Sequence, residues 1–138
     1  SAFSATMILG GQIANDEMRL YLIYPEGNFI EVSANNPFFQ IGETKYGRPI
    51  LVRAFDPAMS FSDAIKLLMV SFDSTIKANL SVGLPLDINI YHNDSLADAE
   101  VLRVSEDDPY YQMISSAWGE ALKASMAQLP EFTFKTCG

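Results

Sequence analysis

Strand-like alternation of apolar and polar positions covers the first third of the chain. Residues 3–9 place Phe3, Ala5, Met7 and Leu9 on one side of a strand that ends at a glycine pair. Further strands are predicted over residues 19–24, 29–32 and 38–41, and the PEGN turn at residues 25–28 joins the first two of these as a hairpin. The first third is therefore predicted to be an antiparallel meander.

Helical spacing of apolar residues follows this meander. A short helix is expected around residues 50–54, and SFSD at residues 60–63 resembles a capping box at the start of a stronger helix. This helix is predicted to continue to near Gly83, because apolar residues recur at intervals of three and four. The residues of this predicted apolar face are Phe61, Ile65, Leu68, Phe72, Ile76 and Leu80.

The last part of the chain repeats the order of strands and then a helix. Strands are predicted over residues 86–92 and 100–105, and Asp108 and Pro109 have the residue types of a helix cap and first turn. Pro130 is expected to end that helix. With no repeat and no linker visible, residues 1–138 are predicted to form a single domain of the α+β class, with layered sheet and helices.

Composition and charge limit the classes of function. The 138 residues are 49% hydrophobic and 19% charged, and no apolar run approaches the length of about eighteen residues that would span a membrane. A net charge of −8 argues against nucleic acid as a partner. The start does not resemble a signal peptide, and Cys137 is the single cysteine, so no disulfide framework, metal site or cofactor is predicted. We expect a cytoplasmic protein that does not bind membranes.

The segment from Tyr24 to Gly47 is the first candidate location for a site. It reads as a hairpin feeding a third strand, which ends in a glycine turn at Gly42, at the start of a helix. Such junctions direct backbone N–H groups and short side chains to one place, so they often carry sites.

Other residues with reactive or polar side chains receive structural interpretations. His92 is expected to be a solvated turn residue, and Asp87 to be buried and hydrogen-bonded rather than to bind a cation. The helically spaced aromatic residues Tyr110, Tyr111 and Trp118 are expected in the core or at subunit contacts.

Several segments resemble consecutive landmarks of bacterial proteasome-type peptidases of the Anbu group, which are related to the HslV peptidases and proteasome β-subunits. The matching segments are SATMILGGQ at residues 4–12, LIYPEGNFIE at 22–31, IGETKYG at 41–47 and NLSVGLPLDI at 79–88, and LDINIYHN at 86–93 is similar to a strand of HslV-type peptidases. The resemblance covers nearly the whole chain, and the order and spacing of the segments make it specific.

The resemblance implies an N-terminal nucleophile hydrolase, in which two stacked antiparallel sheets lie between helical layers in an αββα sandwich. It implies peptide-bond hydrolysis by an N-terminal threonine, peptide or protein substrates, and self-association into an oligomer. The matching landmarks belong to the second half of a proteasome-type subunit, so the nucleophile and its supporting aspartate and lysine are expected upstream of residue 1. Thr6, Thr44 and Thr75 lack the free amine that the mechanism requires, and Ser1 is interpreted as an edge rather than a nucleophile.

Supporting site roles are carried over to three residues. Glu43 and Thr44 follow Gly42 where the family has a Ser-Gly pair near the nucleophile, although Glu43 could equally cap a helix and Lys45 is expected to be a surface cation. Ser81 matches a supporting active-site serine, with the end of a helix as the alternative interpretation. The acidic residue usually found three positions earlier is Ala78 here, and Asp73 or Asn79 is a possible substitute.

The sequence leaves three functions open. The parent protein could be a threonine-type peptidase of which this chain is the non-nucleophilic part, and we favour this prediction. It could instead be a structural subunit of a proteasome-like oligomer, or a non-peptidase amidohydrolase with the same fold.

Overall fold

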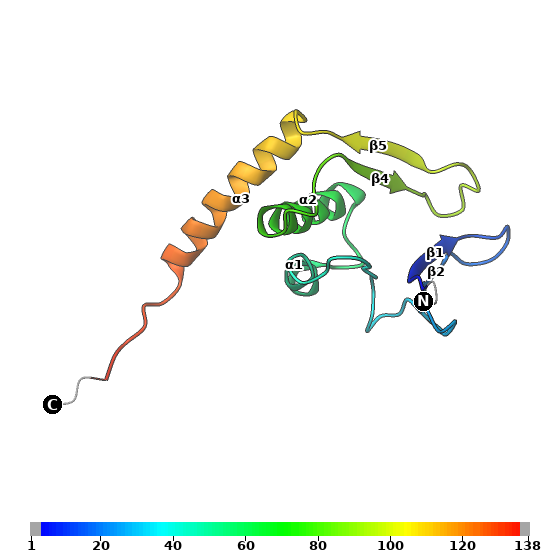
Figure 1. Cartoon of the computed structure of the whole chain (residues 1–138), viewed down its shortest axis with the longest axis horizontal. Helices are drawn as coiled ribbons and strands as arrows, with labels where there is room; N and C mark the ends of the chain where they lie inside the picture. Colours follow the sequence, from blue (N-terminus) through cyan, green and yellow to red (C-terminus); the bar gives the residue numbers. More distant parts are fainter. Residues whose placement is uncertain (1–3, 136–138) are drawn as a thin grey trace.

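Two antiparallel sheets and three helices make up the computed structural model, which describes residues 4–135 (Figure 1). The first sheet has the order β1-β2-β3, with β1 at Met7–Gly11, β2 at Arg19–Ile23 and β3 at Phe29–Glu31. The second sheet pairs β4 (Leu86–Ile90) with β5 (Glu100–Val104). The helices are α1 (Arg48–Ala54), α2 (Phe61–Ala78) and α3 (Pro109–Gln128). The predicted α+β class is confirmed.

The β2–β3 hairpin forms where the sequence predicts it. Tyr24 N donates to Asn28 O at 2.9 Å and Gly27 N donates to Tyr24 O at 2.9 Å, so both ends of the turn are fixed by backbone hydrogen bonds. Gly27 has a φ of +89°, which a residue with a side chain rarely adopts. The turn sets the register in which Ile23 faces Phe29.

The strand predicted over residues 38–41 is not formed. These residues have no regular secondary structure, although the pattern of apolar side chains is that of a strand. A strand needs hydrogen bonds to a neighbour, and within residues 4–135 neither sheet extends beside this segment. The prediction of a strand over residues 38–41 was therefore wrong, although the segment is mainly apolar in composition, as predicted.

The helix α2 packs against both α3 and the second sheet. Its N-cap Ser60 accepts a hydrogen bond from Asp63 N at 3.1 Å, which confirms the predicted cap. The buried core consists of Met69 from α2, Val104 from β5, and Tyr111 and Ile114 from α3. Ile65 and Ile76 of the predicted apolar face pack against this core, whereas Phe61, Leu68 and Phe72 remain exposed.

The helix α2 ends earlier than the sequence predicts. Its last residue is Ala78, and Asn79 already has an extended backbone. The Asn79 side chain accepts a hydrogen bond from Ser81 N, so the side chain closes a local turn that competes with another helical turn. The interpretation of Ser81 and Gly83 as the end of this helix was therefore wrong, and Leu80 lies outside the helix.

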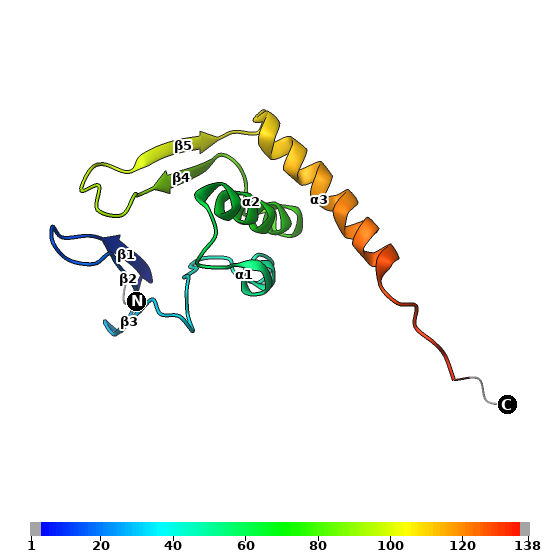
Figure 2. The ribbon, with the colours of Figure 1, turned by 180° about the vertical axis from the view of Figure 1, so that it is seen from behind.

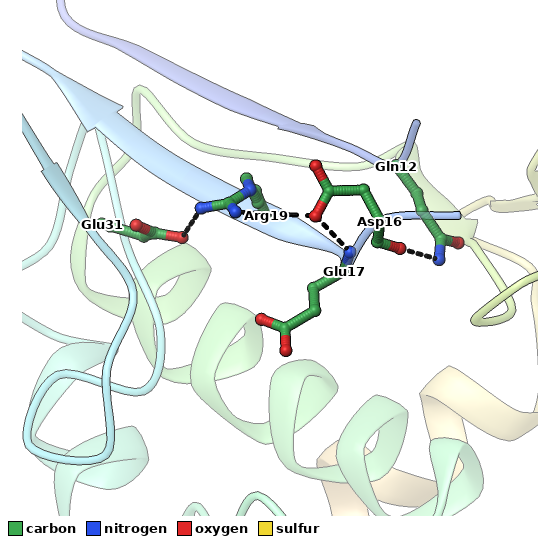
Figure 3. Close-up of polar contacts among 5 residues, drawn as sticks. All are labelled: Gln12, Asp16, Glu17, Arg19 and Glu31. Atoms are coloured by element: carbon green, nitrogen blue, oxygen red, sulfur yellow. Dashed lines mark hydrogen bonds and ion pairs between the residues drawn. The ribbon is translucent and has the colours of Figure 1, made fainter. Parts of the chain in front are cut away.

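A polar cluster centred on Gln12 ties the first sheet to the loop between β4 and β5. Gln12 Nε2 donates to Asp16 O at 2.9 Å across the β1–β2 turn (Figure 3) and to Asp94 Oδ1 at 2.7 Å. Its Oε1 accepts from Tyr91 OH at 2.9 Å and from Asp94 N at 2.8 Å. Gln12 therefore uses both ends of its amide to hold together loops that are far apart in the sequence.

Arg19 connects the β1–β2 turn to β3 in the same region. Its guanidinium lies 3.6 Å from Asp16 Oδ1 and 3.3 Å from Glu31 Oε1, as Figure 3 shows. Asp16 Oδ1 also accepts from Glu17 N at 2.8 Å. All these charged groups are exposed, so solvent screens each pair and its contribution to stability is small.

The helix α3 begins in the core and then leaves the body of the molecule. Asp108 caps it by accepting from Tyr111 N at 2.9 Å, as predicted, and Tyr111 and Ile114 are buried. Figures 1 and 2 show the rest of α3, and the segment that follows it, extending away from both sheets. No helix within residues 4–135 is long and apolar enough to cross a membrane.

Gly47 allows the start of α1 to approach α2 closely. A Cβ atom at this buried position would collide with the Ser71 hydroxyl and would lie 3.2 Å from the Ser71 carbonyl oxygen. We predict that Gly47→Ala lowers the free energy of unfolding by about 1–3 kcal/mol, measured by urea denaturation. Gly119→Ala is the control, because nothing lies within 4 Å of its added Cβ in the α3 interior and stability should rise slightly. Equal effects of the two substitutions would contradict this account.

We predict that the buried Tyr111 makes the free energy of unfolding fall in strong alkali. Burial, followed by the nearby Asp73 carboxylate and the hydrogen bond to it, raises the pKa of Tyr111 to about 12. Its pKa in the unfolded chain is about 10, so the stabilisation is complete below pH 10 and is lost as the pH rises towards 12. Tyr111→Phe should remove this part of the pH dependence of unfolding. Tyr110→Phe, at an exposed neighbour, should keep it, and the same slope in both variants would contradict the prediction.

Candidate functional site

The glycine turn before α1 places Glu43 at the centre of a small hydrogen-bonded structure. Gly42 has a φ of +82°, a conformation in which glycine avoids steric strain. Glu43 Oε1 then accepts from Lys45 N at 3.0 Å, and Thr44 O accepts from Arg48 N at 3.1 Å as α1 begins. One oxygen of the Glu43 carboxylate thus closes a local turn, which leaves the other oxygen for a tertiary contact.

Asn79 connects Glu43 to Ser81. Its Nδ2 donates to Glu43 Oε2 at 3.1 Å, and its Oδ1 accepts from Ser81 Oγ at 2.7 Å and from Ser81 N at 2.9 Å. We call this chain of three side chains the Glu43–Asn79–Ser81 network. Two residues that the sequence nominated separately are therefore joined through a third, and of the two possible substitutes for the acid missing at Ala78 it is Asn79, not Asp73, that contacts them.

The remaining nominated residues lie outside this network. Thr44 is half-buried, and no hydrogen bond of its side chain is found within residues 4–135. Lys45 is exposed, as predicted. Asp73 is buried in α2, where it accepts from Tyr111 OH at 3.1 Å and pairs with Lys77 at 3.2 Å. The buried Thr75 hydroxyl donates to Ser71 O. Ser1 and Cys137 lie outside the described residues.

The expected burial of Asp87 was wrong, whereas its expected hydrogen bonding is confirmed. Asp87 is exposed, and its carboxylate accepts two hydrogen bonds from the Arg103 guanidinium, at 2.8 Å and 2.9 Å. The two residues face each other in the β4–β5 register, on the solvent side of the hairpin, so alternation along β4 turns Asp87 away from the core. The hydrogen bonds from Arg103 lower the pKa of Asp87.

His92 is exposed at the end of β4, as predicted. Its ring packs edge-on against Phe61 with 5.1 Å between centroids, and Nε2 lies 3.9 Å from Glu100 Oε2. Within the part of the chain that the structure describes, no group of three or more His, Cys, Asp or Glu residues is arranged to hold a metal ion.

An open apolar groove of about 450 Å³ adjoins Glu43. We call it the α2 groove. One wall is the unpaired segment 38–41, and the other is the exposed apolar side of α2, with Leu68 and Phe72. Gln40 Oε1 is buried without a hydrogen-bond partner among residues 4–135, which is uncommon for a buried acceptor. The predicted apolar face of α2 is therefore divided, because Leu68 and Phe72 line the groove whereas Ile65 and Ile76 pack against the core.

The α2 groove is lined mainly by apolar side chains and carries the Glu43 carboxylate on its edge. No salt bridge to Glu43 is found within residues 4–135, and each of its carboxylate oxygens accepts one hydrogen bond, which leaves room for more. The Ser81 hydroxyl donates to Asn79 and is free to accept. Of the three network residues Glu43 lines the groove, so its carboxylate can receive N–H or O–H donors from a group bound there.

Solved structures of proteasome-like proteins match this chain over nearly its full length. Anbu from Hyphomicrobium sp. strain MC1 is 47% identical, with a TM-score of 0.90 over 96% of this chain and 57% of that chain. Anbu from Yersinia bercovieri, described as an ancestral β-subunit, is 46% identical, with a TM-score of 0.89 over 96% of this chain and 59% of that chain. No protein-family model matches the chain, and no curated protein matches it.

A third match comes from an assembled complex. The helical assembly of the Anbu complex from Pseudomonas aeruginosa contains a chain that is 45% identical, with a TM-score of 0.90 over 96% of this chain and 55% of that chain. The chain thus spans less than two thirds of the length of the solved structures it matches.

These matches define first a class and then a family. Antiparallel sheets and helices superposed on β-subunit-like proteins at such identity place the fold among the proteasome-like proteins. Within that class the chain belongs to the Anbu family.

The network makes a testable electrostatic prediction. Asn79→Asp replaces an amide donor 3.1 Å from Glu43 with a second carboxylate, and like charges at that distance repel. We expect Asn79→Asp to lower the free energy of unfolding at neutral pH by about 1 kcal/mol, and this loss to shrink as added salt screens the two charges. Asn79→Ala removes the donor without adding a charge, so its effect on urea unfolding should depend much less on salt. The same salt dependence in both variants would disprove the contact.

Proposed function

We propose that this chain is the non-nucleophilic, C-terminal part of a proteasome-like threonine-type peptidase subunit. In this proposal the nucleophile is the N-terminal threonine of a segment that the 138 residues do not include, and the substrate is a peptide or protein. The observation that carries the proposal is the Glu43–Asn79–Ser81 network at the rim of the α2 groove. Glu43 lines the groove and is joined through Asn79 to Ser81, so the two supporting positions implied by the family resemblance belong to one hydrogen-bonded unit.

The proposed reaction uses the free amine of that threonine as its base. The amine accepts the proton of the threonine hydroxyl, whose oxygen attacks the carbonyl carbon of the scissile peptide bond. The C–N bond breaks, the proton passes to the leaving amine, and an ester remains. Water then hydrolyses the ester and restores the threonine.

The residues of this chain would hold the amine rather than react themselves. An amine has N–H donors, and the network offers the Ser81 oxygen and the Glu43 carboxylate as acceptors. Gln40 supports the same arrangement, because its buried and unpaired Oε1 needs a donor that residues 4–135 do not supply. A segment lying in the α2 groove could provide that donor and cover Leu68 and Phe72.

One feature favours a second candidate, a structural subunit of a proteasome-like oligomer. Glu43 occupies a position at which the family resemblance implies a serine, and a carboxylate stabilises an ammonium, which is a poorer base than a free amine. A subunit that binds the amine in this form would keep the fold and lose activity near neutral pH. A non-peptidase amidohydrolase is the further alternative with the same chemistry.

Self-association belongs to the same proposal. The Pseudomonas aeruginosa relative is described as a helical assembly, and this chain exposes many large apolar side chains. We infer that it forms assemblies with copies of itself.

Peptide cleavage tests the proposed function. The 138-residue chain alone should not hydrolyse fluorogenic peptides, and Ser1→Ala should change nothing. The subunit that includes its upstream segment should hydrolyse them, and replacement of its N-terminal threonine by alanine should abolish turnover. Robust turnover by the chain alone that Ser1→Ala removes would overturn the proposal.

Glu43 separates the candidates in the active subunit. Glu43→Gln removes the negative charge and keeps an acceptor, so peptide hydrolysis should reach its maximum at lower pH than in the unchanged subunit. Absence of any peptide turnover in the subunit, with intact folding, would favour the structural candidate. Turnover of small amides but not of peptides would favour the amidohydrolase.

A further inference from the structure

The end of the chain forms a projecting arm with apolar side chains. Every residue from 120 to 135 is exposed, and we call residues 122–135 the arm. Leu122, Met126 and Leu129 recur at the spacing that places side chains on one side of a helix. Beyond the helix, the rings of Phe132 and Phe134 lie 5.0 Å apart and are about 80% exposed.

The body of the same chain does not cover this arm. Figures 1 and 2 show the end of α3 and the segment after it pointing away from α1, α2 and both sheets. An isolated helical end is marginally stable in water, because most helix stability in proteins comes from packing of the apolar face. The arm therefore needs a surface that another molecule supplies.

A second groove has the chemistry to accept it. This groove, which we call the α3 groove, has a volume of about 570 Å³ and lies between α1, α2 and the middle of α3. Its lining is mainly apolar, with Ile50, Met59 and Trp118, and the Lys66–Asp63 ion pair of 3.1 Å lies beside them. The arm likewise carries one acid, Glu131, and two bases, Lys123 and Lys135, among its apolar residues. Apolar surface and charges of both signs are thus present on both partners.

We propose that the arm of one copy binds in the α3 groove of a second copy. The proposal names the contact behind the self-association inferred above and rests on that part of the proposed function. The match to a chain in the helical assembly of Pseudomonas aeruginosa Anbu covers 96% of this chain at a TM-score of 0.90, so that relative has nearly the whole of this shape within an assembly of copies.

An arm-in-groove contact has a defined consequence for symmetry. The arm end and the α3 groove are different surfaces, so a copy that has given its arm still offers its groove. A contact of this heterologous kind grows into a closed ring or an open helix.

Two variants test the arm and the α3 groove separately. The arm variant combines Leu129→Ser, Phe132→Ser and Phe134→Ser, all at exposed positions. The groove variant combines Ala54→Glu and Ala117→Glu, which place charges among the lining residues at exposed positions that tolerate them. The control combines Ile13→Ser, Phe29→Ser and Val101→Ser, three exposed apolar residues away from both surfaces.

Light scattering on the full 138-residue chain reads out the result. Both the arm variant and the groove variant should lose assembled mass at concentrations where the unchanged chain and the control variant remain assembled. A mixture of the two should form a one-to-one complex and stop there, because one copy keeps an intact arm and the other an intact groove.

Trp118 reports the same contact inside the groove. It is the single tryptophan of the chain, so adding Trp118→Phe to the groove variant leaves the arm variant as the only emitter in the mixture. Its emission should shift on mixing. Unchanged mass in the arm variant, or a mixture with neither complex nor emission shift, would overturn the proposal and would show that another partner or surface covers the arm. Peptidase activity plays no part in these measurements, so they fail or succeed independently of the catalytic proposal.

Discussion

The packing of α2 against several neighbours at once is the constraint on which the rest of the structure depends. Its core side touches β4 and β5, its next side meets α3 through the contact between Tyr111 and Asp73, and a third side receives the start of α1. The last contact is possible because Gly47 has no side chain to strike Ser71. The same approach orders the turn that carries Glu43, so the candidate site is positioned by a packing contact four residues away from it.

Local patterning predicted most of the elements, because their causes lie within a few residues. Alternation located β1, β2 and β4, and Ser60 and Asp108 located the starts of α2 and α3 through their own side chains. The predictions failed where a distant or unexpected partner decides the outcome. Residues 38–41 have the composition of a strand and no strand beside them, and a side-chain turn at Asn79 ended α2 before the apolar spacing did.

The candidate site shows the same division. Glu43 and Ser81 were nominated separately by resemblance, whereas the bond that joins them runs through Asn79, 36 residues from Glu43. Spacing along one chain does not reveal such a bond, and nothing about the acid missing at Ala78 favoured Asn79 over Asp73. The Asn-x-Ser order is a weak local signal for a side-chain turn, and it would have pointed to the contact between Asn79 and Ser81.

Two open apolar surfaces distinguish the chain from a self-contained domain. The α2 groove adjoins the network and an unpaired glutamine, which suits a segment of the same subunit, whereas the arm points away from both. This difference matters because the α2 groove would be filled when the subunit is completed, whereas the arm would be covered when two subunits join. The chain covers about three fifths of the length of its solved relatives, and the two surfaces lie on different parts of it, so the proposed assembly contact and the proposed chemistry can be tested separately.

The Gln12 cluster adds a chemical vulnerability to this picture. The amide nitrogen of Gln12 donates to Asp94 Oδ1 and Asp16 O, and the amide oxygen accepts from Tyr91 OH and Asp94 N. The two ends of the amide therefore cannot be exchanged. Hydrolysis of that amide to a carboxylate would set an oxygen against two oxygens and a negative charge against Asp94. Deamidation of this half-buried side chain, which is remote from the candidate site, would thus weaken the link between the first sheet and the β4–β5 loop.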